Sequence, residues 1–183
     1  MRSLIILALM AAPAFADCPA PQDTSRELLN LIARAQAAPD ANAGRRISNE
    51  MWQVWLRAPD EAAQAVLDAG MARRDAYDFL GALKEFDRLV DYCPTYAEGH
   101  NQRAYIHFLR EDYAKALGDL DRALELQPHH IAAQSGRALT LMNLGRLDEA
   151  RAQLLAAVEN NPWLSEAALL ADGAPLGSRD RDI

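Results

Sequence analysis

The sequence predicts an all-α protein built from repeated helical hairpins, and three observations lead to this prediction. Its 183 residues include 36 alanines but only 4 valines, 7 isoleucines and 3 threonines, a composition that favours helices over strands. Apolar residues recur at helical spacing along most of the chain. Prolines recur every 34 residues, at Pro94, Pro128 and Pro162, and a fixed period of this length is typical of repeat arrays.

Residues 1–16 have the pattern of a cleaved secretory signal peptide. Arg2 precedes an apolar run over residues 4–12, and Ala16 closes a small-x-small pattern suited to cleavage directly after it. The run is short of the roughly 20 residues that span a bilayer, which disfavours a membrane anchor. Asp17 in front of Cys18 makes a lipid anchor unlikely, because lipidation sites carry a small residue there. We therefore expect a periplasmic or secreted protein with no membrane span.

Residues 17–59 are predicted to form an extended tail and a helical cap. Residues 17–23 are proline-rich, whereas residues 24–38 read as a helix that begins with a Thr24–Glu27 capping box. A polar linker is expected over 39–46, followed by a second helix over 48–58. Because terminal repeats need a polar cover, we expect this hairpin to cover the exposed end of the first repeat.

Residues 60–171 are predicted to form the repeat array and a short closing helix. In the middle unit, Thr95 and Glu98 suggest a capping box before a helix over 97–110, and a second helix over 113–126 ends before Pro128. Small residues recur at two further positions of the period, which lets the paired helices approach closely. These residues are Gly70, Ala104 and Ala138, and Ala82, Ala116 and Ala150.

The segments DYAKALGDLDRALELQP (112–128) and GRLDEARAQLLAAVENNP (145–162) resemble the second helix and closing turn of tetratricopeptide repeats. The resemblance implies units at 63–96, 97–130 and 131–164, stacked as a right-handed α-solenoid. The expected bulky position four of each unit is Val66, His100 or Gln134 instead, a departure that leaves the packing within each unit open. A short helix over 163–171 and a disordered tail over 172–183 complete the predicted organisation.

The resemblance also implies a function: a non-enzymatic scaffold that binds a peptide or helix of another envelope protein in its concave groove. The implied groove residues are Arg74, Asn101, Tyr105, Phe108, Ser135, Met142 and Asn143. Leu67 and Met71 stand where carboxylate-gripping members of the family carry Lys and Asn, so capture of a terminal carboxylate is not expected. A groove filled by the N-terminal helices is a further option.

Other function classes receive little support from the sequence. A net charge of −7 without clustered cations disfavours nucleic-acid binding. The chain has no nucleophile elbow, phosphate loop or HExxH motif, so neither an enzyme nor a cofactor is expected. His100, His107 and the pair His129-His130 are interpreted as packing and turn residues, because no further ligands converge at zinc spacing. A metal-handling or enzymatic factor with a hidden site remains the alternative.

Two pairs of residues have open interpretations. Cys18 and Cys93 are the only cysteines, and a disulfide between them is favoured over free or intermolecular thiols in an oxidising compartment. Trp52 and Trp55 are expected in the core of the N-terminal cap, with an exposed aromatic patch for a partner as the alternative.

Overall fold

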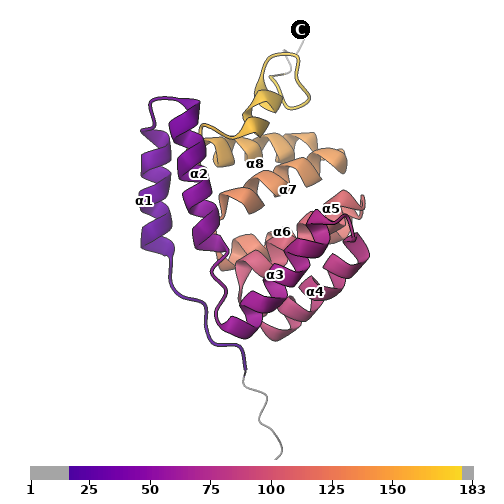
Figure 1. The fold of residues 1–183 in the computed structure, drawn as a ribbon. Helices are drawn as coiled ribbons and strands as arrows, with labels where there is room; N and C mark the ends of the chain where they lie inside the picture. Colours follow the sequence, from indigo (N-terminus) through magenta and orange to yellow (C-terminus); the bar gives the residue numbers. More distant parts are fainter. Residues whose placement is uncertain (1–16, 179–183) are drawn as a thin grey trace, which may run out of the picture.

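The computed structural model describes residues 17–178 and confirms the all-α prediction (Figure 1). The predicted signal peptide over residues 1–16 lies outside the described residues, as do residues 179–183. Between these limits the chain forms helices and no strand. The elements are α1 (Ser25–Gln36), α2 (Ala41–Trp55), α3 (Glu61–Asp75), α4 (Phe79–Tyr92), α5 (Ala97–Leu109), α6 (Tyr113–Leu126), α7 (Ile131–Asn143), α8 (Leu147–Asn160) and the 3-10 helix η1 (Ser165–Leu170).

Helices α3 to α8 form three hairpins stacked as a solenoid, hereafter the repeat hairpins. Each hairpin buries one alanine of the predicted column completely, namely Ala82, Ala116 and Ala150. At the facing column, a Cβ on Gly70 would collide with the ring of Phe86. Small residues at these positions therefore allow the close helix approach that the sequence predicts.

The 34-residue register extends to the backbone conformation of the turn inside each hairpin. Tyr77, Glu111 and Gly145 occupy equivalent positions and have positive φ angles of 60°, 63° and 75°. Only the third turn uses glycine, the residue that adopts this left-handed conformation without steric cost. The first two turns keep the same geometry with less suitable residues.

Helices α1 and α2 form the N-terminal hairpin, which differs from the prediction in two ways. The linker expected over 39–46 is wrong, because α2 begins at Ala41, where the Asp40 carboxylate accepts a hydrogen bond from the Ala43 amide at 2.8 Å. The hairpin also runs beside the ends of helices α5 to α8, instead of covering the outer end of the first repeat hairpin (Figure 1).

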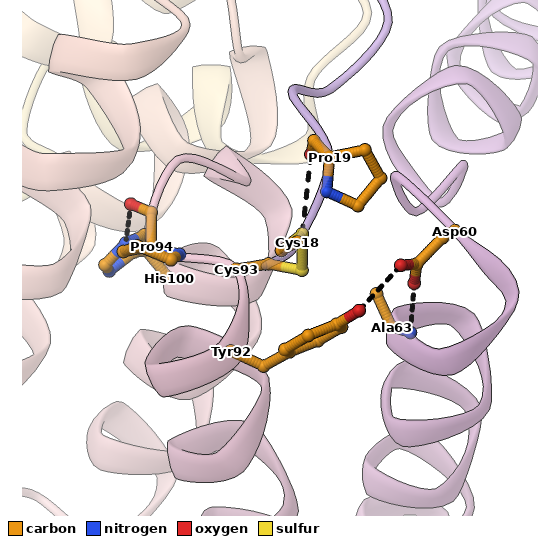
Figure 2. Close-up of a disulfide and its surroundings, with 8 residues drawn as sticks. All are labelled: Cys18, Pro19, Asp60, Ala63, Tyr92, Cys93, Pro94 and His100. Carbon is orange, nitrogen blue, oxygen red and sulfur yellow. Dashed lines mark hydrogen bonds between the residues drawn. A yellow bond between two sulfur atoms is a disulfide. The ribbon is translucent and has the colours of Figure 1, made fainter. Parts of the chain in front are cut away.

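The N-terminal hairpin and the segment before it are held by the three turns that follow α4, α6 and α8. Equivalent residues of these turns make the contacts. Cys93 forms a disulfide with Cys18 (Figure 2). Gln127 donates a hydrogen bond to the Thr24 hydroxyl at 3.2 Å. Asn161 donates one to the Ser48 hydroxyl at 2.9 Å.

A second set of equivalent residues in the same turns packs against the N-terminal hairpin. The Tyr96 hydroxyl donates to the Trp55 carbonyl at 2.6 Å, and the His130 ring stacks on the Trp55 indole at 4.4 Å between centroids. Leu164 packs against the hairpin's apolar core. At the same end, Trp163 lies against Gly44 so closely that any Cβ there would collide with the indole.

Both predicted capping boxes and the predicted C-terminus need correction. Thr24 precedes α1 without a side-chain cap bond, and the residue before α5 is Tyr96, which makes none either. The closing segment is a 3-10 helix over six residues. Residues 172–178, predicted to be disordered, fold back as turns that bury Leu176, whose carbonyl accepts a hydrogen bond from Arg151 at 2.7 Å. Within the described residues, no helix is long and apolar enough to cross a membrane.

Candidate functional site

A groove of about 820 Å³ lies between the N-terminal hairpin and the repeat hairpins. Helix α2 supplies one wall, whereas α3, α5 and α7 supply the other, and the segment over residues 163–166 borders one end. The residues of chief interest in its lining are Trp52, Arg74, Asn101, Tyr105, Phe108 and Ser135. The groove is therefore a site with walls on two sides, open to solvent between them.

The structure brings together five of the seven residues that the sequence assigns to the groove. Met142 and Asn143 are not among its lining residues. They lie in the last turn of α7, beyond the part of that helix that faces α2. Met142 packs against the core of α7 and α8, and the Asn143 amide donates to the Leu139 carbonyl at 2.9 Å.

Tyr105 is the most accessible aromatic residue of the groove. Its side chain is 47% exposed, and Phe108 one turn later is half-buried. The Arg74 guanidinium lies over the Tyr105 ring at 5.9 Å and donates to the side-chain oxygen Oε1 of Gln102 at 2.8 Å. Arg74 also pairs with Asp75 at 2.9 Å, so its charge is balanced locally and its position is fixed.

A buried carboxylate lies beneath the groove floor. Glu98 is 1% exposed and accepts hydrogen bonds from Asn101 at 3.0 Å, from Gln102 at 2.5 Å and from His130 Nε2 at 2.7 Å. His130 Nδ1 accepts from the Ala133 amide at 3.2 Å. This pattern assigns the hydrogen to Nε2 and makes the neutral imidazole a donor to Glu98.

The Glu98 network determines what the groove offers a ligand. One N–H of the Asn101 side-chain amide donates to Glu98, so its second N–H and its side-chain oxygen remain for a ligand. Within residues 17–178, the buried Ser135 hydroxyl has no hydrogen-bond partner. Asn101 and Ser135 are equivalent residues of neighbouring repeat hairpins. They are two of several polar residues that line the groove, and the Ser135 oxygen is buried.

Trp52 lines the groove, although the sequence favours the core of the N-terminal cap for it, with an exposed patch for a partner as the alternative. It is half-buried and packs edge-on against Trp55, with centroids 5.5 Å apart. Trp55 is buried in the hairpin core, as expected, whereas Trp52 lines the groove from α2. No periodic pattern marks Trp52, because α2 lies outside the 34-residue register.

His100 and His107 are buried between helices, whereas His129 is exposed in the turn after α6. His100 lies 3.5 Å from Asp119, which also binds Arg103 at 2.6 Å. Burial alone would raise the pKa of Asp119, but hydrogen bonds from His100 and Arg103 outweigh burial and lower it. His107 is buried, and burial lowers its pKa. Across residues 17–178, no three His, Cys, Asp or Glu side chains gather in a way that could hold a metal ion.

Comparison with protein families gives two matches, both to models described as tetratricopeptide repeat. They cover residues 67–131 and 107–172 and together span more than half of the chain. One match begins in α3 and the other in α5, so neither includes α1 or α2. The family similarity therefore lies in the region where the 34-residue period is found.

Three curated relatives carry the same repeat in their names. A TPR repeat-containing protein of Rhizobium etli is 27% identical over 126 residues, which cover 69% of this chain and 62% of that protein. The tetratricopeptide repeat protein 36 homolog of Nematostella vectensis is 42% identical over 64 residues, 35% of each chain. Human tetratricopeptide repeat protein 36 is 35% identical over 103 residues, 54% of each chain. The chain thus matches between about one third and two thirds of the length of these relatives.

Solved structures share the fold at low sequence identity. The first tetratricopeptide repeat domain of Spaghetti, bound to the HSP90 peptide SRMEEVD, superposes with a TM-score of 0.57 at 23% identity, over 58% of this chain and 84% of that one. The TPR2B domain of yeast Sti1 in its pHsp70 complex gives a TM-score of 0.56 at 20% identity, over 60% and 90%. Both comparisons cover about the length of the repeat hairpins.

Proposed function

Since the chain belongs to the tetratricopeptide repeat family, we propose that it is a non-enzymatic interaction module that holds a peptide segment of another cell-envelope protein in its groove. The observation that carries this proposal is the two-walled groove with aromatic side chains on both walls. Trp52 faces it from α2, and Tyr105 and Phe108 face it from α5. Aromatic anchors of this kind supply much of the binding energy of protein interfaces.

The solved neighbours support peptide binding as the mode of interaction. The Spaghetti domain is bound to a peptide of HSP90, and the Sti1 domain is in a complex with pHsp70. The present groove differs from a carboxylate-binding site in its charges. Leu67 is fully buried and Met71 packs in the same core, so neither position offers a cation or an amide to a terminal carboxylate. We therefore propose that the bound segment lies within the partner chain and not at its C-terminus.

Asn101 supplies the polar contact by which such a segment is recognised. Its side-chain oxygen accepts a backbone N–H of the peptide. Apolar side chains of the peptide pack against Trp52 and Tyr105. The recognised class is a segment with apolar side chains and accessible backbone amides.

The predicted signal peptide and the disulfide support an exported location. Disulfides persist mainly in oxidising compartments, such as the periplasm or the cell exterior. The partners of this module are accordingly sought among envelope proteins.

The test is site-specific photo-cross-linking in cells, with a benzophenone amino acid placed at Tyr105 or at Tyr77. Tyr77 is the matched control, because it is an exposed tyrosine (82%) at a hairpin turn outside the groove. We expect adducts with a defined envelope protein from position 105 and none from position 77. Equal labelling from both positions, or none from either, contradicts the proposal.

A binding measurement follows with the cross-linked segment as a synthetic peptide. Tyr105→Ala is expected to weaken its binding by about 30-fold, which corresponds to a loss of about 2 kcal/mol. Helical content should stay unchanged, because the Tyr105 side chain is exposed. Tyr77→Ala should bind like wild type, and a Tyr105→Ala protein that binds with unchanged affinity places the interface elsewhere.

A further inference from the structure

The segments that precede and follow the N-terminal hairpin are both attached at the end of α4 (Figure 2). At the leading end, the disulfide joins Cys18 to Cys93. At the trailing end, Asp60 accepts a hydrogen bond from the Tyr92 hydroxyl at 2.8 Å and caps α3 by accepting from the Ala63 amide. The disulfide is thus the one covalent link that holds the leading end, whereas the main chain already ties the trailing end to α3.

Away from α4, the polar contacts of the hairpin with the repeats are single neutral hydrogen bonds. Gln127 binds Thr24, Asn161 binds Ser48, and the Gln36 amide binds the Glu159 carbonyl at 2.8 Å. The Trp163 indole nitrogen donates to the Ala35 carbonyl at 2.9 Å, and the Tyr96 hydroxyl donates to the Trp55 carbonyl. The bonds of Gln36 and Gln127 involve partly or largely exposed groups, for which water is an available substitute, whereas the Tyr96 bond is buried. They position the hairpin but are individually weak.

The hairpin also has an apolar core of its own. Leu28, Leu31, Ile32, Ala35, Ile47, Met51, Val54 and Trp55 pack together, and Ile131 is the one fully buried member that comes from the repeats. Such a unit keeps its internal packing when it separates from its neighbour. Segments of this kind open locally at lower free energy than the whole domain unfolds.

An open pocket lies at the junction between the hairpin and the turns. The segment over residues 17–24 contains no helix, and the pocket, of about 370 Å³, lies between this segment, the hairpin and the turns after α4 and α6. Pro21, Val54, Thr95 and Gln127 are among its lining residues. Where the pocket lies, the hairpin and the turns make no packing contacts that would oppose separation.

We propose that the Cys18–Cys93 disulfide is a redox latch for the N-terminal hairpin. When it is oxidised, the hairpin stays across the three turns and α2 forms the second wall of the groove. When a protein dithiol reduces it, the hairpin leaves the turns and the groove loses that wall. This inference concerns the motion of the hairpin and goes beyond the proposed binding function.

The exposure of the two cysteine residues indicates which sulfur a reductant attacks first. Cys18 is half-buried and Cys93 fully buried, so the thiolate of the reductant attacks the Cys18 sulfur. The disulfide breaks, and Cys93 leaves as a thiolate that takes up a proton. The second thiol of the reductant then displaces Cys18 from the mixed disulfide. The products are two cysteine thiols and one oxidised dithiol.

Hydrogen exchange of the whole protein, oxidised or treated with dithiothreitol, tests the latch without any partner. We expect amides of residues 25–55 to exchange at least tenfold faster after reduction, while those of α6 change less than twofold. Unchanged exchange over residues 25–55 overturns the proposal. An equal increase in α6 also overturns it, because the disulfide then stabilises the whole fold and not the docking of the hairpin.

Two variants sharpen the result. Cys18→Ser retains the buried Cys93 side chain but cannot form the disulfide, so it should exchange like the reduced protein and be insensitive to dithiothreitol. Asn161→Ala removes one hydrogen bond to the hairpin with the latch intact, and its oxidised form should exchange less than threefold faster than wild type. A larger increase in Asn161→Ala than in Cys18→Ser contradicts the latch. Because no ligand is needed, these outcomes are independent of the photo-cross-linking result.

Discussion

The N-terminal hairpin and the repeat hairpins are all pairs of antiparallel helices, but different contacts hold them together. The repeat hairpins approach closely over fully buried alanines such as Ala116. The N-terminal hairpin packs through large side chains such as Leu28 and Met51. It docks on the repeats through an aromatic contact, Trp55 with His130, that is not repeated at the 34-residue period. A periodic contact is visible in a sequence, whereas a contact that occurs once is not. The difference explains why one region was predictable and the other was not.

The largest effect is expected where the two regions meet, at Glu98. Glu98→Ala leaves Gln102 and His130 without their buried acceptor, and each buried donor left without a partner costs about 1–3 kcal/mol. Because His130 stacks on Trp55, the loss should extend to the N-terminal hairpin. Urea unfolding measures the free energy change, and tryptophan fluorescence reports on Trp55.

Glu98→Gln is the matched control, since it keeps the side-chain volume and one acceptor. It should be less destabilised than Glu98→Ala. Equal stability of Glu98→Ala and wild type would show that the network does not join the two regions.

Within the repeat hairpins, Ala116→Leu is expected to destabilise the fold by about 1–3 kcal/mol. Ala116 is fully buried between closely packed helices, so a larger side chain overpacks the contact. Gly118→Ala in the same helix is the control, because a Cβ at residue 118 meets nothing within 4 Å. That variant should gain about 0.5–1 kcal/mol from helix propensity. Thermal melts that rank the two variants the other way would contradict the packing argument.

A smaller effect is expected at the turns inside the repeat hairpins. Tyr77→Gly should stabilise the protein by roughly 0.5–1 kcal/mol, because glycine accepts the left-handed φ of 60° without the cost that tyrosine bears. Gly145→Ala should destabilise it by a similar amount at the equivalent turn. Chemical denaturation of both variants checks the pair. If both substitutions change stability in the same direction, the three turns are not equivalent.

The smallest expected effect is a pH dependence of the free energy of unfolding. It comes from a histidine of the second repeat hairpin that the third hairpin replaces with leucine. Burial lowers the pKa of His107 below the ordinary histidine value of about 6.5, so the unfolded chain takes up a proton at higher pH than the folded chain does. The free energy of unfolding therefore falls as the pH drops from about 6.5 through the folded pKa. His107→Leu, which copies the equivalent Leu141, should show a shallower fall in urea titrations between pH 7.5 and 5.5. Identical slopes for both proteins would rule out a contribution from His107.

The repeat hairpins could be predicted because small residues and prolines recur in one register. The capping box predicted for α5 is wrong for a local reason. Tyr96 is the residue that precedes α5, and the Glu98 side chain points inward to His130. The expected linker over 39–46 failed because Gly44 and its polar neighbours resemble a loop. In the structure this glycine lies inside α2, where it makes room for Trp163.

The candidate groove was predictable only on the side of the repeats. Tyr105 and Phe108 occupy positions of the repeat unit whose side chains are expected to face the groove once the register is known. Trp52 could not be assigned to the groove, because its place depends on how the N-terminal hairpin docks. That docking depends on pairs far apart in sequence, such as Trp55 with His130 and Ser48 with Asn161, which no local pattern marks.

The contacts of the N-terminal hairpin with three successive turns have a mechanical consequence. In a solenoid, each helical hairpin contacts only the hairpins next to it. Small rotations at the successive interfaces add up, so the whole stack can bend and twist. The chain from Cys18 to Ser48, which is attached to Cys93, Gln127 and Asn161, bridges three successive turns of this stack and opposes changes in their spacing. The curvature of the solenoid is thereby set before any ligand arrives, and a bound segment meets a surface whose shape costs little further ordering.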